Sequence, residues 1–271
     1  MTSELLGVEA AAWLALEPCP PTRLVVCDID GVITRGEGQP VDLDVIARLA
    51  ALNRAARTDP YVPAVTLCSG RQAPYAELMA QLTDSFLPCI FEHGAGLFFP
   101  RTFRYEFNVA PGYAERLASL RAALEPVLLS TGRAFVQPGK EATTTLYPLS
   151  ASLEEVFERA SEIVALHAPG FGVTRNLQAV EVRPHGVDKA LGVWRIAELL
   201  RLPLERFAGI GDTDPDVSFL RLCGFSAAPA NATPAVRAAV HHVSQHAFGE
   251  GLLDILHVLQ SRNRTVPPAA H

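Results

Sequence analysis

The chain of 271 residues is 49% hydrophobic and 19% charged, which is enough for one large domain or two modest domains with a proper core. Its formal net charge of -6 and its pI near 5.8 argue against a general surface for nucleic acid or for an anionic membrane. No apolar run is long enough, and free enough of helix breakers, to cross a bilayer. We therefore expect neither nucleic acid nor a membrane as a partner.

The cysteines and the N-terminus indicate where the protein works. The five cysteines show no CxxC spacing, and Cys27 and Cys68 lie in apolar runs, in which a thiol behaves as a small hydrophobic group. Glu4 and Glu9, with no basic residue before the first apolar stretch, are not typical of a signal peptide. We expect reduced cysteines and a soluble, cytoplasmic protein.

The first part of the chain alternates between predicted helices and predicted strands. A helix over residues 3–17 comes before a short apolar run, 24–27, which is typical of a buried strand in a parallel sheet. The next predicted elements are a helix near 42–52, a strand at 64–68, a helix at 75–82, a strand at 89–91 and a hairpin at 97–107.

From about residue 111 to residue 184 the pattern becomes helix, strand, strand, repeated once. The two units are a helix at 113–124 with strands at 134–137 and 143–147, and a helix at 153–167 with strands at 171–174 and 179–183. This order predicts a small inserted α+β domain whose sheet has helices on one face. The α/β alternation then resumes with a helix at 189–200, a strand at 207–210, a further helix, an apolar stretch at 225–228 and a helix at 252–259.

Acidic loops follow two of the predicted strands. Asp28 and Asp30 come directly after the first buried strand, and Asp212 and Asp216 follow the strand at 207–210. Ligands of open α/β sheets bind beyond the carboxyl ends of the strands. If these two strands are neighbours, at least three carboxylates converge on one crevice, and their repulsion predicts a hard divalent cation such as Mg²⁺.

Other polar groups should reach the same crevice. Ser69 and Gly70 lie in a strand-to-helix turn, and Lys189 opens a helix. A hydroxyl, an ammonium group, backbone amides and Mg²⁺ are what a transferring phosphoryl group needs as its charge develops. An aspartate beside the metal can form an aspartyl phosphate, and a second carboxylate two residues later can protonate the leaving oxygen and then deprotonate water.

Four motifs in this order resemble those of the haloacid dehalogenase (HAD) superfamily of phosphatases. The matches are Asp28-Ile29-Asp30-Gly31 for the first motif, Ser69-Gly70-Arg71 for the second, Lys189 for the third and Gly211-Asp212…Asp216 for the fourth. The long insertion and the stretch Glu92-His93-Gly94-Ala95 resemble the branch with a large α+β cap. That branch includes Cof-type, sucrose-phosphatase-like and mannosyl-3-phosphoglycerate-phosphatase-like proteins.

The resemblance covers nearly the whole chain and implies an α/β fold. Residues 1–110 and 185–271 would form a doubly wound, Rossmann-like parallel-sheet core, and residues 111–184 would form the α+β cap. Asp28 would be the nucleophile, Asp30 the general acid/base, and Lys189 would neutralise both the nucleophile and the phosphate.

Further roles follow from the same resemblance. Ser69 and Gly70 would hold the phosphoryl oxygens. Mg²⁺ would be bound by Asp28, by the backbone carbonyl of Asp30, by Asp212 and by Asp216. Pro215 departs from the family, which usually has Asn just before the last aspartate of this motif, so a side-chain amide that orients phosphate or lysine is missing.

Several residues have a structural interpretation. We expect Arg71 to pair with an acidic neighbour, His93 to make a structural hydrogen bond and Asn231 to shape a turn. His241, His242 and His246 lack Cys or acidic partners nearby and are expected at the surface rather than on zinc. In the cap, the candidates for substrate contact are Lys140, Thr143, Thr145, Arg175, Asn176 and Arg183.

We therefore predict a Mg²⁺-dependent phosphomonoester hydrolase that acts through an aspartyl phosphate on a small phosphorylated metabolite. The resemblance suggests a sugar phosphate or a phosphoglycerate glycoside, with the cap excluding water, and the protein would be a monomer or a homodimer. Two alternatives remain open: a phosphomutase on the same scaffold, and a non-catalytic ligand-binding protein, which the presence of Pro215 prompts.

Overall fold

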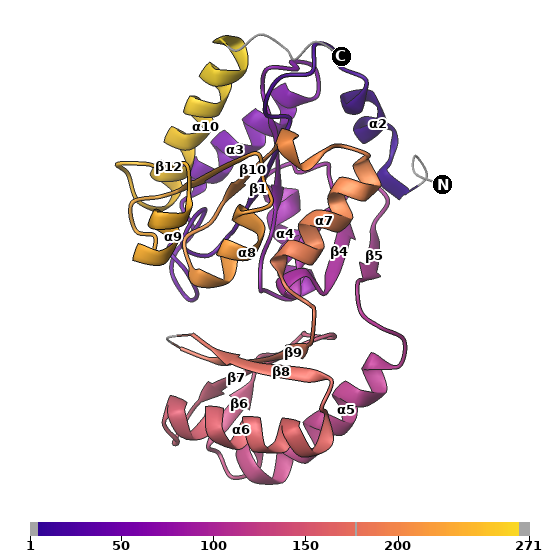
Figure 1. Cartoon of the computed structure of the whole chain (residues 1–271), viewed down its shortest axis with the longest axis vertical. Coiled ribbons are helices and arrows are strands. Elements are labelled where there is room, and N and C mark those ends of the chain that lie inside the picture. The colour runs from indigo at the N-terminus through magenta and orange to yellow at the C-terminus, as the bar shows by residue number, and fades with distance from the viewer. Residues whose placement is uncertain (1–4, 177, 266–271) are drawn as a thin grey trace.

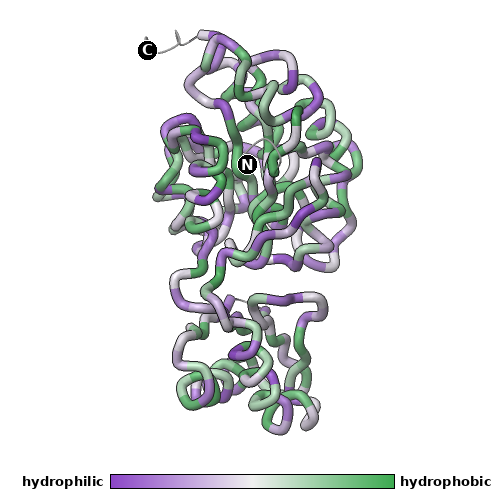
Figure 2. Tube along the Cα trace, turned by 90° about the vertical axis from the view of Figure 1, so that its right-hand side faces the viewer, coloured by the Kyte–Doolittle hydropathy of each residue, from purple (hydrophilic) through white to green (hydrophobic). Residues whose placement is uncertain are grey.

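The computed structural model describes residues 5–176 and 178–265. The chain forms a larger α/β unit from its two ends and a smaller α+β unit from its middle (Figure 1). Two chain segments join the units, as the view in Figure 2 shows. Within the described residues, no helix combines the length and the apolar character needed to span a membrane. All five cysteines are free.

Five parallel strands form the sheet of the larger unit, in the order β12-β11-β10-β1-β2. They are β1 Leu24–Cys27, β2 Ala64–Leu67, β10 Phe207–Ile210, β11 Phe225–Ala228 and β12 His242–Val243. β1 lies between β10 and β2, and all four of its residues are buried. Its apolar run is therefore an inner strand of a parallel sheet, as predicted.

Helices cover both faces of this sheet (Figure 1). Val25 and Cys27 of β1 pack on one face in a core with α3 (Leu43–Ala56), α4 (Ala73–Leu82) and α10 (Phe248–Thr265). The intervening β1 residues pack on the other face in a core with α2 (Val8–Leu14), α7 (Lys189–Leu200), α8 (Val217–Leu220) and α9 (Pro234–Ala239). Because side chains of a strand alternate between faces, one apolar strand supplies both cores. The predicted doubly wound α/β fold is confirmed.

A smaller antiparallel sheet extends the larger unit beyond β2. It consists of β3 Cys89–Phe91, β4 Gly96–Phe99 and β5 Arg104–Phe107, in that order. The predicted hairpin at 97–107 is the β4–β5 pair. A single bridge between Cys68 and Ile90 places β3 beside the end of β2. A 3₁₀ turn, Glu92–Gly94, leads from β3 to β4.

The smaller unit has the predicted order of helix, strand, strand, repeated once. Its four antiparallel strands follow the order β6-β7-β9-β8, with bounds β6 Ala134–Val136, β7 Thr144–Pro148, β8 Phe171–Arg175 and β9 Val180–Pro184. Helices α5 (Tyr113–Leu124) and α6 (Leu153–His167) pack on one face of this sheet, and a π-helical turn, Glu125–Leu129, continues α5. The other face of the sheet lies toward the larger unit (Figure 1).

The C-terminal region differs from the sequence prediction in two ways. β12 and α9 were not predicted, because a two-residue strand and a six-residue helix show no periodic pattern. Helix α10 runs well past residue 259, where its apolar pattern ends. Buried Asn263 holds this extension, since its side chain accepts a hydrogen bond from the Thr22 amide and donates to the carbonyls of Thr22 and Tyr61.

The predicted helix at 3–17 is shorter in the structure. Its described part includes α2, Val8–Leu14, while residues 3 and 4 lie outside the described residues. Gly7, with a positive φ, comes directly before α2, and the helix ends with Ala15 as its C-cap.

Glu92 of the larger unit binds the smaller unit, which corresponds to the predicted cap and is called the cap from here on. This carboxylate is fully buried and accepts hydrogen bonds from the backbone amides of Glu141, Ala142 and Thr143 and from the Thr143 hydroxyl, at 2.8–3.0 Å. From the cap side, Arg121 of α5 donates to the carbonyls of Lys140 and Thr143. The loop before β7 is therefore held from both units.

We expect Glu92→Ala to lower the free energy of unfolding by about 2–4 kcal/mol, because three backbone amides lose their buried acceptor. Urea-induced unfolding of the variant and the native protein measures this difference. Glu141→Ala is the control, since it removes an exposed carboxylate from the same loop. An equal loss in both variants, or none in either, would contradict the anchoring role of Glu92.

Candidate active site

A cleft of about 670 Å³ lies between the carboxyl ends of the parallel strands and the cap. From the larger unit it is lined by Asp28, Asp30, Gly31, Arg35, Gly36, Glu37, Gln39, Ser69, Gly70, Arg71, His93, Lys189, Asp212, Thr213, Pro215 and Phe248. From the cap it is lined by Gln137, Lys140, Tyr147, Asn176, Gln178, Ala179 and Glu181. The predicted acidic loops and the predicted cap therefore face the same space.

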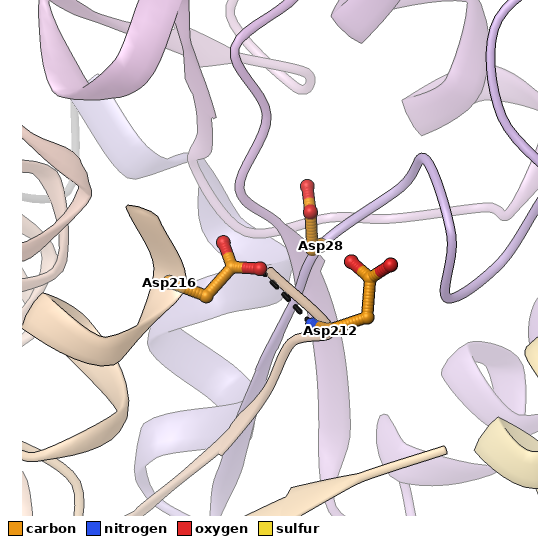
Figure 3. A group of neighbouring side chains, drawn as sticks. All are labelled: Asp28, Asp212 and Asp216. Carbon is orange, nitrogen blue, oxygen red and sulfur yellow. Dashed lines mark hydrogen bonds between the residues drawn. The ribbon is translucent and has the colours of Figure 1, made fainter. Parts of the chain in front are cut away.

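Three carboxylates come together at the ends of two neighbouring strands. Asp28 follows β1, while Asp212 and Asp216 follow β10, and β1 pairs directly with β10. One oxygen of each carboxylate lies within 4.8 Å of the others, and all three residues are buried (Figure 3). The expectation that the two strands are neighbours is confirmed.

Lys189 lies among these carboxylates. Its ammonium group is 2.9 Å from Asp28 Oδ1 and 2.5 Å from Asp216 Oδ1, and its side chain is buried. Asp188, the N-cap of α7, accepts a hydrogen bond from the Leu191 amide and so fixes the start of this helix. Burial alone would lower the pKa of Lys189, but Asp216 and Asp28 raise it well above its usual value, so Lys189 is a cation.

A single lysine leaves this cluster short of positive charge. Burial and the neighbouring Asp216 raise the pKa of Asp212 to about 7, and the same two causes raise the pKa of Asp28. Within the described part of the chain, the buried Oδ1 of Asp212 has no hydrogen-bond partner. Buried carboxylate oxygens without a partner are the ligand type that hard divalent cations prefer. The donor set therefore fits a metal ion of this kind.

Asp216 is more fully engaged than the other two carboxylates. Its Oδ1 bonds Lys189, and its Oδ2 accepts from the amides of Asp212 and Thr213, each at 3.0 Å, and from the Thr213 hydroxyl. Pro215 sits in the first turn of the 3₁₀ helix Asp214–Asp216, where the missing amide costs no helical bond. The structure thus uses the carboxylate of Asp216 itself to orient Lys189.

Asp30 has different surroundings from Asp28, although only one residue separates them. Arg71 donates to both of its oxygens, from Nε to Oδ2 at 2.7 Å and from Nη2 to Oδ1 at 3.1 Å. Thr34 Oγ1 also donates to Asp30, at 3.2 Å. The expected pairing of Arg71 with an acidic neighbour is confirmed, and the Asp30 carboxylate is not part of the three-carboxylate group.

Ser69 and Gly70 lie in the turn between β2 and α4. The Ser69 hydroxyl is buried and accepts a hydrogen bond from the Arg71 amide at 3.1 Å. The His93 amide donates to the Ser69 carbonyl, and the His93 ring packs on Gly70 so closely that a Cβ there would lie 2.3 Å from it. These contacts fix the turn beside Asp28, and its role toward phosphate stays a prediction.

In the cap, Lys140 and Glu181 form a buried pair in the cleft. Lys140 Nζ lies 3.4 Å from Glu181 Oε2 and also contacts the Thr145 hydroxyl, while His93 Nε2 lies 3.4 Å from the same Glu181 oxygen. Although burial would raise the pKa of Glu181, His93 and Lys140 outweigh it and lower this pKa to about 2. Lys140 is therefore neutralised by a partner within the protein.

The remaining cap candidates occupy different places. Asn176 lines the cleft, whereas Thr143 is bound to Glu92. Arg175 forms an ion pair with Glu154 on the exposed side, and among the described residues that border the cleft neither Arg175 nor Arg183 is found. Their role in substrate binding gains no support from these positions.

The structure also brings in residues that the sequence did not single out. They are Glu37 of the larger unit and Gln137, Tyr147 and Glu181 of the cap, which all line the cleft. Gln137 and Tyr147 contact Glu37 across the boundary between the two units. The interpretation of Asn231 as a turn residue is extended: it donates to the Gly31 carbonyl and accepts from the Phe248 amide, which ties the first acidic loop to α10. His241 bonds Ser226, and His241, His242 and His246 are not part of the metal-capable group.

Comparisons with known proteins agree with this geometry. Residues 146–256 match the family model described as haloacid dehalogenase-like hydrolase. A phosphoglycolate phosphatase of Methanopyrus kandleri is 29% identical over 88% of this chain and 97% of that protein. One of Methanothrix thermoacetophila is 40% identical, but over only 29% of this chain and 35% of that relative. A haloacid dehalogenase-like hydrolase from Bacteroides thetaiotaomicron has the same fold, with a TM-score of 0.71, 17% identity and coverage of 88% and 99% of the two chains.

The fold, the cleft and these likenesses describe an enzyme that has a doubly wound α/β core, a cap and an acidic site at the end of its parallel sheet. The chain is similar to haloacid dehalogenase-like hydrolases over residues 146–256 and to phosphoglycolate phosphatases over most of its length, and these likenesses support an enzyme of the phosphatase type.

Gly31 offers a test of the acidic site. Its φ of +89° favours glycine, and an added Cβ would lie 2.0 Å from Asp212 Oδ2, so any side chain must displace this carboxylate. We expect Gly31→Ala to weaken Mg²⁺ binding about tenfold or more, which corresponds to at least about 1.4 kcal/mol. Isothermal titration calorimetry with Mg²⁺ measures the affinity.

Gly38→Ala is the matched control. Gly38 also has a positive φ, of +72°, but an added Cβ there would meet no atom within 4 Å. The two substitutions share the backbone cost, and only Gly31→Ala disturbs Asp212. Equal Mg²⁺ affinities of the two variants would show that Asp212 takes no part in binding the ion.

Proposed function

We propose that the protein is a Mg²⁺-dependent phosphomonoester hydrolase that acts through a phosphorylated Asp28. The observation that carries this proposal is the different environment of two aspartates separated by one residue. Asp28 contacts Lys189 beside Asp212, while Asp30 is held apart by Arg71. Two carboxylates in different environments are suited to two different roles, one as nucleophile and one as proton carrier.

Asp28 is arranged to attack phosphorus. Its Oδ1 accepts from the Ile29 amide at 2.8 Å and contacts Lys189, while among the described residues no hydrogen bond reaches Oδ2. Oδ2 would attack the phosphorus, and the P–O bond to the leaving group would break. Lys189 and the turn at Ser69–Gly70 would face the negative charge on the phosphoryl oxygens. Bound at Asp28, Asp212 and Asp216, Mg²⁺ would neutralise charge on the nucleophile and the phosphate.

Asp30 would move the protons. In its protonated form it would give its proton to the leaving oxygen as the P–O bond breaks. The resulting carboxylate would then take a proton from water, which attacks the phosphorus of phosphorylated Asp28. The bond between phosphorus and the Asp28 oxygen breaks, and both inorganic phosphate and the Asp28 carboxylate are released.

We further propose residues 111–184 as the cap domain and residues 1–110 and 185–271 as the core domain. The cap contributes one wall of the cleft, and its closure would keep bulk water away from the phosphorylated aspartate. A small substrate that the cap can cover fits this arrangement. We also propose that the protein works in the cytoplasm on a soluble metabolite of this kind.

Phosphoglycolate is the first candidate substrate, because several relatives that span most of this chain are named phosphoglycolate phosphatase. The cleft also contains a positive charge that could bind the carboxylate of phosphoglycolate, namely that of Arg35. Arg71, Lys140 and Lys189 each pair with acidic side chains, whereas no ion pair of the described residues involves Arg35. Sugar phosphates and phosphoglycerate glycosides, suggested by the sequence resemblance, are the next candidates.

Release of phosphate from a panel of these esters, with Mg²⁺ and with EDTA, tests the proposed function. We expect turnover that requires Mg²⁺ and that disappears in Asp28→Asn, because the amide is no nucleophile. Circular dichroism would verify that the variant is folded. Turnover that survives in Asp28→Asn would refute the mechanism, and the absence of turnover unless a bisphosphate activator is added would favour a phosphomutase.

Arg35→Ala tests the substrate class. We expect KM for phosphoglycolate to rise about 10- to 100-fold, the loss of one charge-assisted hydrogen bond, while KM for uncharged alkyl phosphates changes little. Arg104→Ala, an exposed arginine on β5, is the control for the loss of a positive charge. Equal effects of Arg35→Ala on both ester types would show that Arg35 does not read the carboxylate.

A further inference from the structure

A chain of polar contacts connects Asp30 to the cap. It begins with Arg71, whose guanidinium contacts both oxygens of Asp30, as described above. Arg71 Nε also lies 3.2 Å from Glu37 Oε1, so one N–H group faces two carboxylates. The guanidinium stacks on the ring of Tyr75 at 4.7 Å, which limits its movement to the plane in which both carboxylates lie within reach.

The cap holds the other end of this chain. The hydroxyl of Tyr147, in β7, donates to Glu37 Oε2. Gln137, which follows β6, reaches Glu37 Oε1 at 3.5 Å, the outer limit of a hydrogen bond. Burial and the adjacent Glu37 raise the pKa of Tyr147, so the phenol keeps the proton that it donates. Glu37 is thus the residue through which these two cap side chains connect to Arg71.

The position of Glu37 decides how Arg71 is shared. With Oε2 held by Tyr147, Glu37 keeps its Oε1 3.2 Å from Arg71 Nε, the same N–H group that donates to Asp30 Oδ2 at 2.7 Å, and Arg71 is bidentate on Asp30. Without Tyr147, or without the negative charge of Glu37, this second carboxylate would no longer hold Arg71 in the position in which it is bidentate on Asp30. The side chains of Asp30, Arg71 and Glu37 are 23%, 16% and 31% exposed, so solvent does not fully screen these interactions.

We propose that Glu37 and Tyr147 are positioning residues, which let the docked cap fix Arg71 and so orient Asp30 for proton transfer to the leaving group. The inference rests on the proposed function of Asp30 as general acid. It assigns the cap a second task besides covering the cleft: the acid is oriented only when the β6–β7 hairpin is in contact with Glu37. Glu37 and Tyr147 touch no reacting atom and act through Arg71.

The leaving group makes this role measurable. An alkoxide such as glycolate is a poor leaving group and needs the proton of Asp30 while the P–O bond breaks, whereas p-nitrophenolate is stable and leaves without it. The ratio of kcat for phosphoglycolate to kcat for p-nitrophenyl phosphate, each at saturating substrate, therefore falls when proton transfer to the leaving group is impaired. Loss of stability or of metal affinity changes both values together and leaves the ratio constant.

The experiment compares this ratio in the native enzyme, in Tyr147→Phe and in Glu37→Gln. We expect the ratio to fall about tenfold in each variant, a part of the 10²–10⁴ that general acid catalysis contributes. Tyr105→Phe is the matched control, because the hydroxyl of Tyr105 also donates to a glutamate, Glu77. Tyr105 lies on β5, and neither residue lines the cleft. Tyr105→Phe should leave the ratio unchanged.

Each other result overturns the inference. An unchanged ratio in Tyr147→Phe and Glu37→Gln, whether or not both esters react more slowly, would show that the contact is only structural or only affects binding. If Tyr147→Phe fails to fold, Glu37→Gln alone decides, since it keeps the size and an acceptor oxygen for Tyr147. Failure of the native enzyme to hydrolyse either ester with Mg²⁺ would refute the proposed function, and the inference with it.

Discussion

Three carboxylates and one ammonium group are buried together at the ends of two neighbouring strands, and much of the structure serves to hold these charges in place. Asp28, Asp212 and Asp216 would repel one another strongly in so dry a site if Lys189 were absent. Their meeting depends on the parallel pairing of β1 with β10 and on the start of α7 beside them. The remaining negative charge is why the site suits a divalent cation.

The same loop gives two aspartates, separated by one residue, different surroundings. Asp28 still belongs to the strand, since its amide donates to the Ile210 carbonyl, and its side chain enters the buried cluster. At Gly31 the chain turns with a positive φ, and the loop closes as the Gly31 amide donates to Thr34. Asp30 therefore points away from the cluster toward Arg71. An extended strand would have placed both carboxylates on one side, in direct repulsion.

Residues whose positions follow from the order of the strands could be predicted from the sequence, whereas residues whose partners come from a separate unit could not. The strand ends, Asp28, Asp212 and Lys189 were predictable, because parallel strands bring loops from distant segments to one edge. Glu37, Tyr147 and Glu181 lie in a loop and in cap strands whose local patterns are ordinary, and the contacts of Tyr147 with Glu37 and of Glu181 with His93 form only where the cap meets the larger unit. Arg175 was a plausible substrate contact from its charge, yet it pairs with Glu154 and does not line the cleft. A strand pattern indicates which residues alternate but not which face meets the core domain.

The two contacts between cap and core differ in how easily they break. The Glu92 contact is fully buried and consists of hydrogen bonds to backbone amides, which would be left without partners if it opened. The Glu37 contact joins side chains at the rim of the cleft, where water can replace Tyr147 and Gln137. A cap movement that breaks the Glu37 contact and preserves the Glu92 contact therefore costs less than the reverse. Opening of the cleft for substrate would thus release the side of the site that holds Asp30, while the charges around Lys189 would stay in place.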